Sequence, residues 1–138
     1  MKKVIIFCLV SILLLPLLAA GCGGHTIELS LDDFTAQNNI VKNIELCPGG
    51  TITVKLGSNP STGYQWGDAE ISSETVITQI SHKYNEPENT ELMGAPGTDV
   101  FVFDAKTTGS ATITISYSRP WEGGEKDTYT LTIDVTVK

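Results

Sequence analysis

The sequence predicts an all-β fold of two packed sheets with seven to eight strands, and three observations support this. Apolar and polar residues alternate in most segments after residue 26, which is the period of a strand with one buried face. Turn residues separate these segments at 48–50, 107–109 and 123–124. No window of about eleven residues or more has a helical period. Many short alternating strands in one domain are typical of a β-sandwich.

The alternation is clearest near the C-terminus. Over 111–118, Ala, Ile and Tyr residues face one way while Thr and Ser residues face the other, and 129–137 repeat this pattern. Trp66 lies on a predicted strand near the middle of the chain, where an immunoglobulin-like core holds a large aromatic residue between its sheets. The sandwich is therefore expected to be immunoglobulin-like. The other predicted strands are 27–31, 40–46, 52–56, 64–66, 75–80 and 99–106.

The N-terminal segment is predicted to direct export. Lys2 and Lys3 precede an apolar run over 4–18, which is shorter than the roughly 20 residues of a membrane-spanning helix. Leu-Ala-Ala-Gly-Cys at 18–22 resembles the bacterial lipobox, in which the cysteine thiol is acylated and the chain is cut before it. The alternative is an uncleaved or ordinarily cleaved signal peptide in which Cys22 is incidental.

The lipobox resemblance implies three parts of the chain. These are a lipoprotein signal peptide at 1–21, a lipid-anchored tether at 22–26 and the immunoglobulin-like domain at 27–138. The protein would then be an exported lipoprotein, held on the periplasmic or cell-surface side of a membrane through Cys22.

Charge and cysteine content exclude further classes of protein. Loss of Lys2 and Lys3 changes the formal net charge from −7 to −9, and no Lys or Arg cluster remains. We therefore expect no nucleic-acid partner.

Cys8 is lost with the signal and Cys22 carries the lipid, which leaves Cys47 without a disulfide partner. A half-buried position at a strand end is expected for Cys47, with a reactive thiol as the alternative.

The sequence carries no recognisable catalytic or metal-binding motif. His25 and His82 have no Cys or Ser partner at a nucleophile spacing. Zinc, calcium and phosphate-loop motifs are missing from the sequence. We therefore expect no enzyme activity, no cofactor and no metal ion.

Three connections between predicted strands have the composition of a binding surface. They cover 58–63, 81–97 and 119–124. In an immunoglobulin-like order of strands these are the B–C, D–E and F–G connections, which open at the same end of the sandwich. Each alone could be an ordinary turn or a long loop. Their common location favours a binding function.

Two of these connections, 58–63 and 119–124, have features that are typical of binding loops. Pro60 fixes φ and Gly63 permits a positive φ, so a stiff turn is expected, with Ser61 and Thr62 exposed at its tip. A loop tryptophan such as Trp121 is typical of an interface anchor. The alternative is that Trp121 folds back over the end of the sandwich.

The three connections together resemble the chagasin family of cysteine peptidase inhibitors. The motifs are Asn-Pro-Ser-Thr-Gly-Tyr at 59–64, Gly-Ala-Pro-Gly at 94–97 followed by Phe101, and Arg-Pro-Trp at 119–121. The resemblance covers about residues 27–137 and implies a domain that inserts three loops into the active-site cleft of papain-like enzymes. The implied peptidase-binding residues are Asn59, Pro60, Ser61, Thr62, Gly63, Leu92, Met93, Gly94, Ala95, Pro96, Gly97, Arg119, Pro120 and Trp121.

The resemblance also implies a role for each loop. Ser61 and Thr62 would lie at the catalytic cysteine of the peptidase without presenting a cleavable bond. Residues 92–97 would contact one wall of the cleft, and Arg119 and Trp121 the other. Two positions depart from the family pattern, because Ser61 replaces a frequent Thr and the proline at position 96 stiffens the second loop.

The predicted function is therefore reversible, tight-binding inhibition of a papain-like cysteine peptidase by a monomer. The alternative is a non-inhibitory immunoglobulin-like binding or adhesion module at the cell surface. A carbohydrate-binding surface is disfavoured because only Trp121 and Tyr84 are loop aromatics in this prediction.

Overall fold

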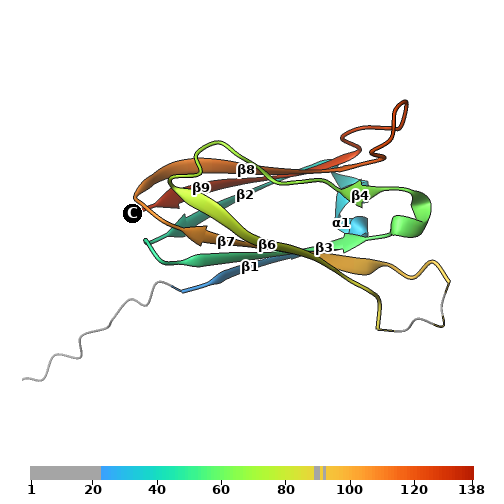
Figure 1. Cartoon of the computed structure of the whole chain (residues 1–138), viewed down its shortest axis with the longest axis horizontal. Helices are drawn as coiled ribbons and strands as arrows, with labels where there is room; N and C mark the ends of the chain where they lie inside the picture. The colour runs from blue at the N-terminus through green and yellow to red at the C-terminus, as the bar shows by residue number, and fades with distance from the viewer. Residues whose placement is uncertain (1–22, 89–90, 92) are drawn as a thin grey trace, which may run out of the picture.

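The computed structural model describes residues 23–88, 91 and 93–138, which fold as two β-sheets packed face to face (Figure 1). The first sheet has the order β1–β3–β7–β6, formed by His25–Leu29, Thr51–Ser58, Gly97–Ala105 and Ile77–Asn85. The second has the order β2–β9–β8–β4, formed by Asn39–Leu46, Tyr129–Val137, Gly109–Ser118 and Gln65–Trp66, and β5 (Glu70–Ile71) pairs with β8. The predicted two-sheet sandwich is confirmed.

Two of the strand pairs are parallel, and both involve the N-terminal part of the domain. β1 runs parallel to β3 in the first sheet, and β2 runs parallel to β9 in the second. The chain passes from one sheet to the other through α1 (Leu31–Ala36), which lies at one end of the sandwich (Figure 1). Phe34 of α1 is fully buried, with its ring 5.3 Å from Trp66 and 5.4 Å from Tyr129. The helix therefore closes that end of the core.

The core is built from the alternating apolar residues that the sequence identifies. β3 and β7 bury every second side chain, including Ile52 and Phe101, and β8 and β9 do the same with Ile113 and Leu131. Trp66 is 3% exposed, and its indole N–H donates a hydrogen bond to the carbonyl oxygen of Gly57 at 2.9 Å. Because Gly57 belongs to the other sheet, the prediction of an inter-sheet tryptophan is confirmed.

The structure differs from the predicted strands in three places. The strand predicted over 75–80 begins at Ile77 and continues to Asn85, past a β-bulge between Gln79 and Ser81 that interrupts the alternation. β5 was not predicted, because two residues are too few to show a period. The strand predicted over 27–31 ends at Leu29, and the six-residue α1 that follows is also too short to show a helical period.

Cys47 lies half-buried, just after the end of β2, as expected. The expectation that it has no disulfide partner is wrong, because Cys47 is disulfide-bonded. The other two cysteines of the chain, Cys8 and Cys22, lie outside the described residues. The predicted signal peptide and the start of the tether lie outside them too. Among the helices that the structure describes, none has the length and apolar character needed to cross a membrane.

Candidate functional site: three loops at one end of the sandwich

Three loops extend from the end of the sandwich at which α1 lies (Figure 1). Loop 1 is 59–64 between β3 and β4, loop 2 is 86–96 between β6 and β7, and loop 3 is 119–128 between β8 and β9. The common location predicted from the sequence is confirmed. Loop 2 is shorter than the predicted connection over 81–97, because β6 and β7 extend into it.

Loop 1 is a tight turn held by its own hydrogen bonds. A single 3₁₀ turn covers Pro60–Thr62 and ends at Gly63, whose φ is +84°. The backbone N–H of Thr62 donates to the carbonyl of Asn59 at 3.1 Å, and its hydroxyl donates to the same oxygen at 2.7 Å. Ser61 and Thr62 are exposed. The predicted stiff turn with a polar tip is confirmed.

Loop 3 packs against loop 1 through aromatic and cationic side chains. The guanidinium carbon of Arg119 lies 4.5 Å from the centre of the Tyr64 ring and 5.9 Å from that of Trp121. Its Nη2 donates to the carbonyl oxygen of Thr62 at 3.4 Å. The Trp121 ring lies directly over Gly63, where a Cβ atom would collide with it. Arg119 therefore bridges the two loops, and Trp121 remains half exposed.

A second set of contacts fixes the backbone of loop 3. The ammonium group of Lys126 donates to the carbonyl oxygens of Arg119 at 2.7 Å and Trp121 at 2.9 Å. The Tyr64 hydroxyl donates to the carboxylate of Glu125, and this hydrogen bond raises the pKa of Tyr64 above its ordinary value. Loop 3 is thus attached to loop 1 at both ends of its turn.

Loop 2 meets loop 1 on its other side. The side-chain amide of Asn59 donates to the carbonyl oxygen of Gly94 at 3.0 Å, and Gly94 has a φ of +80°. Met93 is fully exposed, and Pro96 is exposed as well. Ala95 is half-buried, and Leu92 lies outside the described residues.

Gly97 occupies a different position from the other predicted site residues. It is buried at the start of β7, opposite Ser58 of β3. A Cβ atom on Gly97 would collide with Tyr84 and the backbone of Asn85. The two strands below loop 2 are also joined by a 2.6 Å contact between Nε2 of His82 and Oδ1 of Asp99. Gly97 therefore belongs to the base of loop 2 rather than to its exposed part.

An aromatic column under loop 1 supports the loops from the core. The Tyr117 hydroxyl accepts a hydrogen bond from the Asn59 N–H at 3.0 Å. The Tyr117 ring lies 5.4 Å from that of Tyr64 and 4.8 Å from that of Trp66. The sequence predicts the position of Trp66 but carries no local signal for the roles of Tyr117 and Glu125, whose contacts are with residues distant in sequence.

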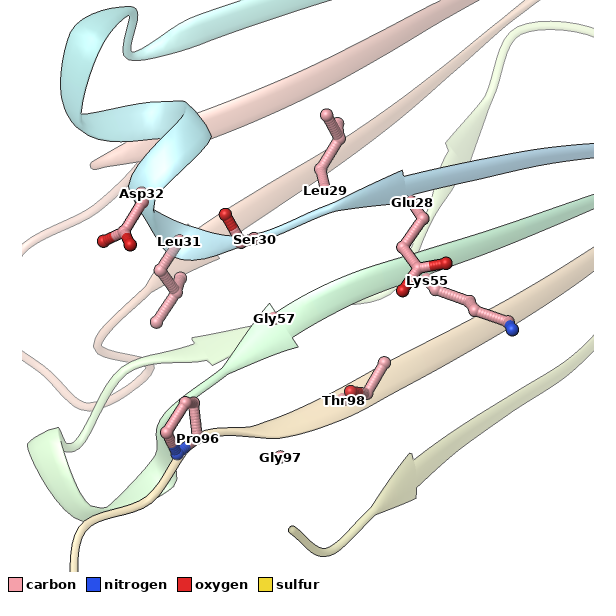
Figure 2. A pocket seen from close by; sticks show the side chains of 10 residues that line it. All are labelled: Glu28, Leu29, Ser30, Leu31, Asp32, Lys55, Gly57, Pro96, Gly97 and Thr98. Atoms are coloured by element: carbon pink, nitrogen blue, oxygen red, sulfur yellow. The ribbon is translucent and has the colours of Figure 1, made fainter. Parts of the chain in front are cut away.

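A hollow beside the base of loop 2 lies outside the loop tips. Figure 2 shows Leu31 of α1, Gly57 of β3 and Pro96 of loop 2 around it. Glu28 and Lys55 are cross-strand neighbours at its other end. Its lining contains no His or Cys residue. Across the described part of the chain, no group of three His, Cys, Asp or Glu residues is placed to hold a metal ion.

Comparisons with known proteins agree with this geometry. A family model described as chagasin family peptidase inhibitor I42 matches residues 45–133, a segment that contains all three loops. Chagasin of Trypanosoma cruzi is 34% identical over 89 residues, which cover 62% of this chain and 79% of chagasin. Amoebiasin-2 of Entamoeba histolytica is 32% identical over 87 residues, which cover 63% of this chain and 70% of that protein.

Solved structures show the same sandwich. The cysteine protease inhibitor EhICP2 of Entamoeba histolytica superposes with a TM-score of 0.63 at 26% identity, over 84% of this chain and 96% of that one. PbICP-C, solved in complex with falcipain-2, superposes with a TM-score of 0.60 at 22% identity, over 81% and 99% of the two chains. At that identity the second likeness concerns the fold alone.

Proposed function

The chain belongs to the chagasin family of peptidase inhibitors, and we propose that it blocks papain-like cysteine peptidases by placing loops 1, 2 and 3 in the active-site cleft. It is a cysteine peptidase inhibitor rather than an enzyme. The alternative of a non-inhibitory adhesion module finds no support in the comparisons.

One observation carries the three-loop mechanism: loop 1 is hydrogen-bonded to both of its neighbours. Asn59 joins it to loop 2 and Arg119 joins it to loop 3. The loops thus have their relative positions before any partner arrives, so little conformational entropy is lost on docking. The three preformed loops thus block the cleft reversibly, and a single copy of the domain is sufficient for inhibition.

The exposed residues suit different parts of a cleft. Ser61 and Thr62 are small, polar and exposed at the tip of loop 1, which allows them to approach a catalytic cysteine closely. Trp121 offers a large half-exposed ring to an aromatic wall. Arg119 supports that ring from behind, since its guanidinium lies between Trp121 and Tyr64.

The test is a titration of papain with the purified exported protein, its cysteines intact, while hydrolysis of a fluorogenic peptide is followed. Competitive, stoichiometric inhibition without cleavage of the inhibitor is the expected result. The matched variant is Trp121→Ala, which should weaken inhibition by about thirtyfold or more, as expected for an interface anchor worth about 2 kcal/mol. Its thermal unfolding should change little, because Trp121 is 50% exposed. A folded Trp121→Ala variant that inhibits normally would exclude Trp121 as an anchor.

We also propose that the protein is exported and held at a membrane through lipidated Cys22, on the sequence pattern at 18–22. A Cys22→Ser variant should move from the membrane fraction to the soluble fraction. A thioether-linked lipid occupies the cysteine sulfur, so the same residue cannot form a disulfide. Since Cys47 is disulfide-bonded, the mass of the N-terminal peptide must be measured as well. A peptide of Cys22 that carries no lipid, or a variant that stays in the membrane fraction, would contradict the proposal.

A further inference from the structure

Met93 is far more exposed than any other large apolar residue that the structure describes. Its exposed fraction is 100%, compared with 54% for Val41 and 50% for Trp121. It lies on loop 2 directly before Gly94, whose carbonyl oxygen accepts the hydrogen bond from Asn59. Met93 also lines the same hollow as Pro60 and Ser61 of loop 1. Its thioether is therefore accessible to solvent and lies beside the tip of loop 1.

Met93 is also chemically distinct in the exported protein. The sequence has two methionines, and the other is Met1, at the start of the predicted signal peptide. Oxidation of sulfur side chains follows their accessibility. Cys47 is half-buried, so its sulfur is less accessible to an oxidant than the Met93 thioether. Met93 is therefore the most exposed sulfur atom among the residues that the structure describes.

We propose that Met93 is an oxidation site through which peroxide weakens the inhibitor; this rests on the proposed function. One oxygen atom passes from hydrogen peroxide to Sδ of Met93. The peroxide O–O bond breaks, the S–O bond forms, and water leaves. The sulfur loses two electrons, and the peroxide gains them. Methionine sulfoxide reductases reverse the reaction, which makes the change a switch rather than damage.

Oxidation changes what loop 2 presents to a peptidase. A flexible apolar side chain becomes polar, and its new oxygen must be hydrogen-bonded or left unpaired when the loop docks against the cleft wall. The sulfoxide has no role in the fold, because the Met93 side chain is fully exposed in the free protein. We expect a loss of affinity without a loss of stability, about tenfold or more in the inhibition constant.

The experiment uses the exported protein, purified in mild detergent with its cysteines intact. It is treated with dilute hydrogen peroxide, catalase removes the excess, and papain is added afterwards so that its own thiol is not oxidised. Peptide mass mapping follows the gain of about 16 Da on the peptide that contains Met93. The matched control is Met93→Leu, for which the treated and untreated inhibition constants are compared with each other. A methionine sulfoxide reductase is then applied to the treated protein.

The expected result has three parts. The treated native protein loses about tenfold or more in affinity, the reductase restores it, and Met93→Leu shows the same constant before and after treatment. Complete sulfoxide formation with an unchanged constant would overturn the proposal, and so would an equal loss in Met93→Leu. Failure of Met93 to react under conditions that oxidise free methionine would overturn it as well. If the untreated protein does not inhibit papain, the proposed function fails first, and the role of Met93 fails with it.

Discussion

Loop 3 and loop 2 lie on either side of loop 1, but they are attached to it in different ways. Loop 3 is joined by the Arg119 guanidinium, by the Trp121 ring over Gly63, and by the hydrogen bond between Tyr64 and Glu125. Loop 2 is joined to loop 1 through the hydrogen bond from the Asn59 amide to the Gly94 carbonyl oxygen, and it carries the fully exposed Met93. Loops 1 and 3 thus form one packed unit, whereas loop 2 is an arm beside it.

This difference suggests that the two sides contribute differently to binding. A packed unit keeps its shape, and it contributes affinity because little order has to be gained on docking. An arm with exposed apolar residues can adjust to different cleft walls, so it contributes to the choice of peptidase. The substitutions below separate these contributions, and they are ordered from the largest expected effect to the smallest.

Gly63→Ala should have the largest effect, because it breaks the packed unit. The substitution places a Cβ atom against the Trp121 ring and forces alanine into a left-handed conformation, at a cost of about 1–2 kcal/mol. We expect both a lower melting temperature and a loss of papain inhibition of about thirtyfold or more, comparable to removal of an anchor. Inhibition constants and thermal unfolding curves measure the two effects separately.

Gly123→Ala is the matched control for this substitution. Gly123 has a similar φ of +76°, but a Cβ atom there would meet nothing within 4 Å. Its alanine variant should therefore lose similar stability and much less inhibition. If the two variants lose inhibition equally, backbone strain rather than displacement of Trp121 explains the effect.

The two sides of the site also differ in how well the sequence predicts them. The turn of loop 1 was predictable because its determinants are local: Pro60 and Gly63 impose the backbone, and Thr62 bonds to Asn59 three residues before it. The sandwich was predictable for a similar reason, since each strand carries its own alternation. Trp66 could be placed between the sheets because a large aromatic residue on a strand near the middle of the chain is expected in the core of such a sandwich. Its strand, β4, is an edge strand of the second sheet rather than a central one.

The links between the loops could not be predicted in this way. The hydrogen bond from Tyr64 to Glu125 spans 61 residues of sequence, and that from Arg119 to Thr62 spans 57. The family pattern assigned Arg119 to the peptidase-facing wall, and no local signal indicated its contact with Tyr64. The continuation of β6 past the bulge was hidden because residues 81–85 are exposed and show no apolar face.

Asn59→Ala should have an intermediate effect, because it detaches the arm. The variant loses the hydrogen bond to Gly94 and the acceptor for the Ser61 hydroxyl, which lies 2.5 Å from Oδ1 of Asn59. Two hydrogen bonds at about 1 kcal/mol each predict a loss of inhibition of about five- to thirtyfold. Asn59→Asp keeps the acceptor for Ser61 but removes the donor to Gly94. If Asn59→Asp inhibits as well as the native protein, the link to loop 2 is unimportant for binding.

Glu125→Gln should have the smallest effect on inhibition and a clear effect on Tyr64. In the native protein, the carboxylate accepts a hydrogen bond from the neutral phenol, which raises the Tyr64 pKa. Ionisation of Tyr64 would break that bond and place two negative charges together. The hydrogen bond between Tyr64 and Glu125 is therefore fully present below the ordinary tyrosine pKa of about 10, and it is lost as the pH rises through the raised pKa of Tyr64. The neutral amide of Gln still accepts a hydrogen bond but no longer opposes ionisation.

The pKa of Tyr64 should therefore fall in Glu125→Gln, while papain inhibition near neutral pH changes by about threefold or less, because a hydrogen bond remains. Spectrophotometric titration of the tyrosines measures the pKa, and Tyr64→Phe identifies which part of the curve belongs to Tyr64. A loss of inhibition as large as that of Gly63→Ala would mean that the charge of Glu125, rather than the stacking of Arg119 and Trp121, holds loop 3 against loop 1. An unchanged titration curve would show that the hydrogen bond between Tyr64 and Glu125 does not persist in solution. The distinction between the packed unit of loops 1 and 3 and the arm of loop 2 would then rest on the contacts of Arg119 and Gly63 alone.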